Sequence, residues 1–175
     1  QYNISEGYPP LRELLKQRMK SQNCFSENDD LIVTSGAQQA IELASKVLCN
    51  EGDTLIAESP SFIGSLNAFR SFNVNLIGIE QEEGGMKLDE LEKAITPETI
   101  MISVMFANNE IGSIQPIREI GAIAKEHGIL FHTDAVQAFG QVPINVDELG
   151  IDMLSSSGHK LNGPKGIGFL YIRKG

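Results

Sequence analysis

Residues 99–134 have the sequence TIMISVMFANNEIGSIQPIREIGAIAKEHGILFHTD, and they decide the fold class. The segment 99–106 is almost wholly apolar, which is typical of a buried strand. Apolar residues then recur at helical spacing across 117–124, and a second apolar segment at 129–131 predicts another strand. A strand, a helix and a strand in this order predict two parallel strands joined by a helical crossover.

The same alternation continues toward both ends of the chain. We expect further strands at residues 31–33, 54–57, 74–79, 152–154 and 166–172, and further helices at residues 11–19, 40–48, 62–72 and 88–95. The sequence therefore predicts an α/β domain with a mostly parallel sheet and helices on both of its faces. Ligand-binding groups in such sheets lie in the loops at the carboxyl ends of the strands, so a site is expected there.

The composition excludes several classes of protein. Hydrophobic residues make up 41% and charged residues 21% of the chain, which is ordinary for a globular domain. A net charge of −9 disfavours a broad surface for nucleic acid or anionic membranes. No apolar run approaches the about 20 residues that cross a bilayer, and the polar first residues show no signal peptide. Cys24 and Cys49 fit neither a disulfide framework nor a metal site, so we expect a protein of the reducing cytoplasm without a metal. From the charge and the missing apolar run, we expect no nucleic-acid or membrane partner.

The loop at residues 34–39, TSGAQQ, joins a predicted strand to a predicted helix. Gly36 allows a tight turn, after which the N–H groups of Gly36, Ala37 and Gln38 lie at the helix N-terminus without helical partners. Together with the helix dipole, such donors favour an anion such as a phosphate. The alternative is an ordinary helix-capping turn.

Two further loops place polar side chains after buried strands. Asn108 and Asn109 follow the strand at 99–106, where their amides either donate to a ligand oxygen or form an Asx turn. Asp134 ends the next strand, where a carboxylate requires either a cation, such as a protonated ring nitrogen, or a role in capping the following turn. Gln137 lies three residues further on, and its side-chain amide is able to hydrogen-bond to a phenolic oxygen of a bound ligand.

The loop at residues 155–166 contains Lys160, directly after His159. A lysine in such a loop is able to lose its proton and attack a carbonyl to form a Schiff base, and the alternative is a solvated surface lysine. The spacing GxxxxGK[ST] is missing, which argues against a nucleotide-binding P-loop. An anion cradle, a buried carboxylate, amide donors and a loop lysine are the groups that a pyridoxal 5′-phosphate site needs.

Five segments between residues 96 and 173 resemble the cysteine desulfurases, in the class V aminotransferase group of fold-type I pyridoxal phosphate enzymes. They are VMFANNEIG (104–112), QPI (115–117), HTDAVQ (132–137), SGHK (157–160) and GPKGIG (163–168). The resemblance implies that Lys160 is the Schiff-base lysine and that Asp134 is the partner of the pyridine nitrogen.

The resemblance also implies roles for four other polar side chains of these segments. Asn109 and Gln137 would contact the ring oxygen or its surroundings. Ser157 and His159 would help to hold the phosphate.

The first half of the chain is similar to a different group, the class I aminotransferases. The shared segments are GYPPLR (7–12), TSGAQQA (34–40) and ESPSF (58–62). The resemblance implies that Ala37 and Gln38 bind the phosphate and that Phe62 stacks on the ring, where desulfurases usually have a histidine. The chain is therefore either a member of a divergent lineage or a hybrid of two related folds.

Members of both families are considerably longer than this chain and carry a second, smaller domain. We therefore expect residues 1–175 to be a single cofactor-binding large domain without the small C-terminal domain. The desulfurase cysteine that accepts sulfur is expected beyond Gly175, because neither Cys24 nor Cys49 matches it. The resemblance further implies a homodimer, since these families build their sites at a subunit interface, and a sulfur-acceptor protein as a partner.

The sequence supports three hypotheses about function. The first is a pyridoxal phosphate-dependent enzyme that acts on an amino acid, most like a cysteine desulfurase that transfers sulfur from L-cysteine. In that enzyme Lys160, once freed, or His159 would move protons at the α-carbon of the substrate. The second hypothesis is a class I-type aminotransferase. The third is a catalytically inactive folded hybrid or fragment.

Overall fold

The computed structural model describes residues 4–174, which contain one eight-stranded sheet. The strands are β1 (Asp30–Thr34), β2 (Thr54–Ser59), β3 (Asn75–Glu82), β4 (Gly85–Met86), β5 (Thr99–Met105), β6 (Leu130–Asp134), β7 (Met153–Ser157) and β8 (Gly168–Ile172). The helices are α1 (Pro9–Ser21), α2 (Ala37–Leu48), α3 (Ile63–Arg70), α4 (Leu88–Ala94), α5 (Ile117–His127) and the short 3₁₀ helix η1 (Gly158–Leu161).

The sheet is mostly parallel, as the strand and helix alternation predicts. The strand order is β1-β8-β7-β6-β5-β2-β3-β4. The five strands from β7 to β3 in this order are parallel to their neighbours. By contrast, β8 runs antiparallel to both β1 and β7, and β4 runs antiparallel to β3. The predicted α/β class with a mostly parallel sheet is therefore confirmed.

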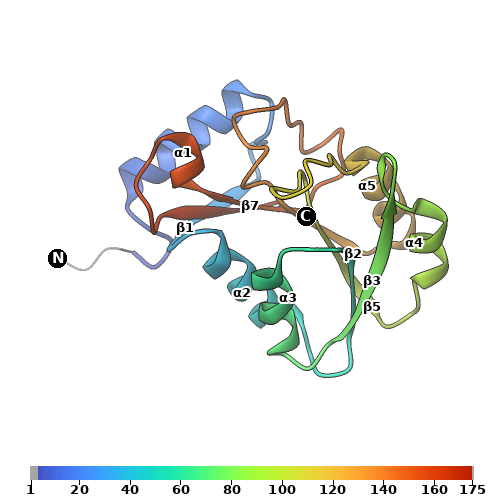
Figure 1. Ribbon diagram of the computed structural model, residues 1–175. Coiled ribbons are helices and arrows are strands. Elements are labelled where there is room, and N and C mark those ends of the chain that lie inside the picture. Colours follow the sequence, from blue (N-terminus) through green and yellow to red (C-terminus); the bar gives the residue numbers. More distant parts are fainter. Residues whose placement is uncertain (1–3, 175) are drawn as a thin grey trace.

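Helices cover both faces of this sheet, and each face has its own apolar core (Figure 1). On one face, Ala40 and Ile41 of α2 and Phe69 of α3 pack against strand residues such as Leu55 and Met101. On the other face, α1, α4 and α5 contribute buried residues to the larger cluster. None of the helices within residues 4–174 has the length and apolar character needed to cross a membrane.

The structure differs from the sequence prediction at element ends and in one hairpin. The strand predicted at 74–79 extends as β3 to Glu82, and a two-residue strand, β4, folds back on it. The segment 80–85 is polar and glycine-rich, so hydrophobic periodicity gives no signal for this hairpin. The strand predicted at 166–172 begins only at Gly168, and the lysine-bearing loop forms η1.

A close backbone approach holds the turn between β1 and α2 against the edge of β7 and β8. Gly168 is the first residue of β8 and pairs with both Thr34 and Ser157. A Cβ atom on Gly168 would collide with the carbonyl oxygen of Ser156 and would lie 2.8 Å from the Cα of Gly36. Only glycine at residue 168 therefore lets these three segments meet.

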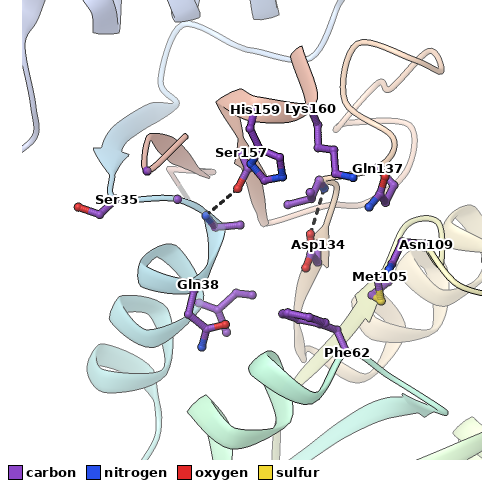
Figure 2. A pocket seen from close by; sticks show the side chains of 15 residues that line it. Ser35, Gln38, Phe62, Met105, Asn109, Asp134, Gln137, Ser157, His159 and Lys160 are labelled. Carbon is purple, nitrogen blue, oxygen red and sulfur yellow. Dashed lines mark hydrogen bonds between the residues drawn. The ribbon is translucent and has the colours of Figure 1, made fainter. Parts of the chain in front are cut away.

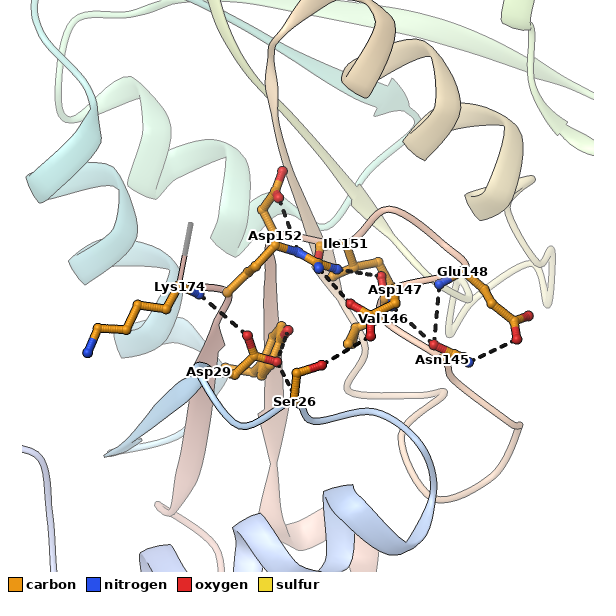
Figure 3. A network of polar contacts seen from close by, with 11 residues as sticks. Ser26, Asp29, Asn145, Val146, Asp147, Glu148, Ile151, Asp152 and Lys174 are labelled. Atoms are coloured by element: carbon orange, nitrogen blue, oxygen red, sulfur yellow. Dashed lines mark hydrogen bonds and ion pairs between the residues drawn. The ribbon is translucent and has the colours of Figure 1, made fainter.

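A polar network holds the other end of β8 in place (Figure 3). The Tyr171 hydroxyl donates to Asp29 Oδ2 at 2.7 Å, and the Arg173 guanidinium donates to Asp147 Oδ1 at 2.6 Å. Arg173 also donates to the carbonyl oxygens of Val146 and Ile151. These bonds connect β8 to the loops that precede β1 and β7. Strand β8, which lies between β1 and β7, is therefore held at both of its ends.

We expect the substitution G168A to lower the free energy of unfolding by about 3 kcal/mol, because the added methyl group has no space between two backbones. Urea denaturation followed by circular dichroism measures this loss. G78A is the matched control, since its Cβ would meet only the side chain of Ser59, at 3.2 Å, and it should cost less than about 1 kcal/mol. Equal losses in the two variants would contradict the tight approach.

Candidate active site

A pocket of about 380 Å³ opens where β5, β6 and β7 end and α2 begins (Figure 2). Its size is ordinary for a small-molecule site. The structure brings together in this pocket all ten residues that the sequence nominated, namely Gly36, Ala37, Gln38, Phe62, Asn109, Asp134, Gln137, Ser157, His159 and Lys160. Sequence reasoning did not nominate the other five lining residues, which are Ser35, Ile41, Met105, Val136 and Gly166.

The N-terminus of α2 forms one wall of the pocket and is suited to an anion. Gly36 has a φ of +92°, a conformation that favours glycine, and the helix starts directly after it. The Ala37 N–H donates to Ser157 Oγ at 3.0 Å, whereas the N–H groups of Gln38 and Gln39 find no acceptor within residues 4–174. First-turn donors, the helix dipole and a serine hydroxyl therefore converge on one place.

Asp134 is the last residue of β6 and faces the same pocket (Figure 2). Its side chain is buried, and its Oδ1 accepts the Val136 N–H at 3.0 Å, so it also caps the following turn. Burial raises the pKa of Asp134 to about 6, because a carboxylate removed from water is destabilised. None of the ion pairs within the described residues involves Asp134, so a cationic ligand group would supply the missing partner.

His159 and Lys160 lie on η1, immediately after β7, and both side chains are exposed at the pocket. Figure 2 shows the Lys160 side chain directed toward Asp134 and Gln137. The lysine is thus both accessible to solvent and part of the pocket wall, so a small molecule is able to reach its amine. Ser157 precedes η1 and joins this segment to α2 through the bond to Ala37.

The two asparagines after β5 have different roles: one forms the predicted turn, and the other is available to a ligand. Asn108 forms the Asx turn, because its Oδ1 accepts the N–H groups of Glu110 at 2.8 Å and Ile111 at 3.1 Å. Asn109 lines the pocket instead. The turn made by the first asparagine therefore presents the second one to a ligand.

Phe62 forms another wall, just before α3. Its ring lies so close to Gly64 that a Cβ there would collide with it, and Gln38 Nε2 donates to the Gly64 carbonyl at 3.0 Å. The aromatic ring is 44% exposed, which leaves a surface available for stacking. Figure 2 shows the ring on the side of the pocket opposite His159 and Lys160.

Sequence reasoning missed two buried titratable groups behind the pocket, His132 and Glu58. His132 lies between Ser103 Oγ, 2.7 Å from its Nδ1, and Ser155 Oγ, 3.2 Å from its Nε2. Burial lowers the pKa of His132 to about 4, so the ring is neutral and bridges β5 and β7 across β6. The sequence signal for such a group is a polar residue inside an apolar strand segment. Its hydrogen-bond partners lie on neighbouring strands, so they become known only when the strand order is known.

The chemistry of these groups fits pyridoxal 5′-phosphate. A phosphate requires donors at a helix N-terminus, which α2 and Ser157 supply. A protonated pyridine nitrogen requires a buried anion, which Asp134 supplies. An aldehyde requires an accessible amine, and a flat ring requires an apolar face, for which Lys160 and Phe62 are present.

Comparison with known proteins agrees with this chemistry. Residues 13–175 match the model of the family described as aminotransferase class-V. The chain belongs to the class-V aminotransferase family. One relative is the cysteine desulfurase IscS of Dictyoglomus turgidum, which is 44% identical to this chain. The match covers 86% of this chain and 40% of the length of the relative. The similarity to desulfurases therefore extends beyond residues 96–173, where the motifs indicated it.

Two solved structures share the architecture. SspA in complex with cysteine is 35% identical, with a TM-score of 0.80 over 99% of the class-V chain and 54% of its own. The SepCysS–SepCysE N-terminal domain complex contains a chain with a TM-score of 0.86 and 23% identity, over 99% of this chain and 48% of that one, which shows the fold alone. The class-V chain thus spans about half or less of the proteins that it matches.

We expect D134N to stabilise the cofactor-free protein above pH 6, because the fold disfavours the ionised form of Asp134. The stability that the un-ionised form provides is complete below pH 3.8, the ordinary pKa, and is lost as the pH rises through about 6. At ~1.4 kcal/mol per tenfold change in acidity, the difference in free energy of unfolding should reach about 3 kcal/mol at pH 8 and fall to about 0.5 kcal/mol at pH 4.

Urea unfolding of both proteins between pH 4 and pH 8 measures this difference. D147N is the control of opposite sign, because Arg173 holds the pKa of Asp147 below its usual range. That variant should be less stable than the wild type at pH 7, with a loss that shrinks toward acid pH. A D134N curve parallel to the wild-type curve would mean that Asp134 is not destabilised by burial.

Proposed function

We propose that this protein is a pyridoxal 5′-phosphate-dependent enzyme of the cysteine desulfurase type, which acts on an amino acid. The observation that carries the proposal is the convergence of Ser157, Asp134 and Lys160 with the N-terminus of α2 in one pocket. Ser157 and Lys160 come from neighbouring elements, whereas Asp134 ends a different strand and α2 begins about a hundred residues earlier in the chain. The family membership supports the same cofactor, since cysteine desulfurases and aminotransferases depend on it.

Each pocket residue then has a definite task toward the cofactor. The N–H groups of Ala37 and Gln38, with Ser157 Oγ and His159, would bind the phosphate. The Asp134 carboxylate would accept a hydrogen bond from the protonated ring nitrogen. Phe62 would stack on one face of the ring, and the side-chain amides of Asn109 and Gln137 would donate hydrogen bonds to a ring oxygen.

Lys160 would hold the aldehyde carbon through its amine and later act on protons. When bound, the cofactor supplies an electron sink for negative charge that develops at the α-carbon of an amino acid. Lys160 Nζ would take or return the α-proton of the amino acid, and His159 would be the neighbouring second base. The exposed position of both side chains gives the substrate access to them.

Two observations favour L-cysteine as the substrate over other amino acids. The chain is 44% identical to a cysteine desulfurase and 35% identical to SspA, whose structure holds cysteine. Phe62 favours the second candidate, an aminotransferase, because an aromatic residue at this place is typical of the class I group. A catalytically inactive folded domain is the third candidate, and it predicts that the pocket does not bind the cofactor.

The surrounding assembly is part of the same proposal. Residues 1–175 would form the cofactor-binding large domain, which is consistent with a chain that spans 40% of the desulfurase relative. The protein would act in the cytoplasm as a homodimer and deliver sulfur to an acceptor protein. Among the structural neighbours, SepCysS was solved in a complex with the N-terminal domain of SepCysE.

We expect titration of the purified protein with pyridoxal 5′-phosphate to give a saturable visible absorbance band that K160A abolishes, because the band requires a covalent link to that amine. K165A is the matched control, since Lys165 lies in the same loop without lining the pocket, and it should retain the band. The absence of a band in the wild type, or a band that survives in K160A, would refute the proposal.

The products formed from L-cysteine separate the desulfurase from the aminotransferase. The assay uses a full-length protein that includes the sulfur-accepting cysteine expected beyond Gly175, and there we expect sulfide and alanine in equal amounts in the presence of a reductant, without need for a keto acid. An aminotransferase would instead convert a keto-acid acceptor into its amino acid and would release no sulfide. Sulfide and amino-acid analysis of the same reaction measures both, and keto-acid-dependent turnover without sulfide would contradict the desulfurase assignment.

A further inference from the structure

Glu58 is a buried acid that the proposed mechanism does not use. It is the second-last residue of β2, is 2% exposed and does not line the pocket. Its Oε1 accepts two hydrogen bonds, from Ser61 Oγ at 2.8 Å and from the Met105 N–H at 3.2 Å. Its Oε2 is buried and has no hydrogen-bond partner among the described residues. A buried carboxyl group of this kind is costly, so its place requires a reason.

The two donors to Glu58 connect two walls of the pocket. Met105, at the end of β5, lines the pocket itself, and Ser61 directly precedes Phe62. The ladder between β2 and β5 ends at Ile56 and Ile102, so the Met105 N–H lies beyond the last paired residues. One carboxyl oxygen thus takes the place of the missing strand partner and ties the chain that leaves β2 to the end of β5.

The charge state of Glu58 suits this task. Burial raises the pKa of Glu58 to about 7, and the carboxyl of Asp134 acts in the same direction. Asp134 is the ionisable group that bears on Glu58 from the neighbouring strands, whereas Met105 and Ser61 face it with neutral donors. The hydrogen bonds from Ser61 and Met105 act in the opposite direction, and Oε1 is able to accept both of them in the neutral as well as the ionised form.

We propose that Glu58 is a positioning residue, which holds Ser61 against the end of β5 and thereby fixes Phe62 as a wall for the cofactor ring. We call the contact of Glu58 with Ser61 and Met105 the clamp. It is a property of the cofactor-free fold, and its effect on the ring rests on the proposed function. Glu58 acts through Ser61 and Met105 and touches no reacting atom.

Hydrogen exchange of the cofactor-free protein, followed by mass spectrometry, tests the clamp independently of the cofactor. E58A and S61A should both speed amide exchange in residues 61–66, whereas E58Q, which keeps the acceptor oxygen, should match the wild type. S71A is the matched control, because Ser71 donates only to Ala68 at the far end of α3. If S61A leaves exchange in this segment at the wild-type rate, the clamp is refuted, and this variant decides even where E58A folds poorly.

The visible circular dichroism of the cofactor-loaded protein tests the effect on the ring, because this signal requires a fixed asymmetric environment. E58A and S61A should weaken it and raise the dissociation constant of pyridoxal 5′-phosphate about tenfold, the equivalent of one hydrogen bond. E58Q should stay within about twofold of the wild type, and the E58A/S61A double variant should lose no more than either single one.

The outcomes separate the two proposals. A normal lysine-dependent band with unchanged dichroism in E58A and S61A would overturn the positioning role while the proposed function stands. Failure of the wild type to bind the cofactor would overturn the proposed function, and the exchange rates would still decide whether Glu58 holds Ser61.

Discussion

The candidate site depends on one contact, the hydrogen bond from the Ala37 N–H to Ser157 Oγ. It joins two residues that are 120 positions apart, and it is the point where the N-terminus of α2 meets the end of β7. Gly168 makes the contact feasible, because no larger residue lets the backbones of Gly36 and Ser156 approach it. Since η1 continues directly from Ser157, this bond also sets the distance between the anion-binding donors and Lys160.

Much of the fold and of the site could be predicted because both follow from simple regularities. The buried strands have continuous apolar segments, and parallel strands bring their following loops to one edge, so polar residues after strands were sound candidates. All ten predicted site residues, which include Gly36, Ala37 and Phe62 besides the polar ones, lie in one pocket. Polar strands without periodicity could not be predicted, and β4 is the example. Nor could sequence distinguish Asn108 from Asn109, because only the turn geometry decides which side chain bonds to the backbone.

Three buried titratable groups beneath the pocket share one physical origin. Asp134, Glu58 and His132 are all held in an environment with little water, and burial drives each toward its neutral form. His132 contacts two serines, Glu58 accepts two donors on Oε1 but leaves Oε2 without a partner among the described residues, and Asp134 has only the Val136 N–H. Of the three groups, Asp134 is the one that lines the pocket, which is where a cationic ligand would recover the cost of its burial.

The place of β8 between β1 and β7 also sets the order in which the molecule assembles. Strand β1 precedes β8 by more than a hundred residues, yet β8 is the strand with which it pairs. During synthesis on the ribosome, β1 and the turn into α2 therefore emerge long before β8, the strand with which β1 pairs. The parallel centre from β2 to β7 is able to form first, and closure of this long loop requires β8 to have emerged. A nascent chain would thus acquire its ligand-binding edge only after β8 has been synthesised.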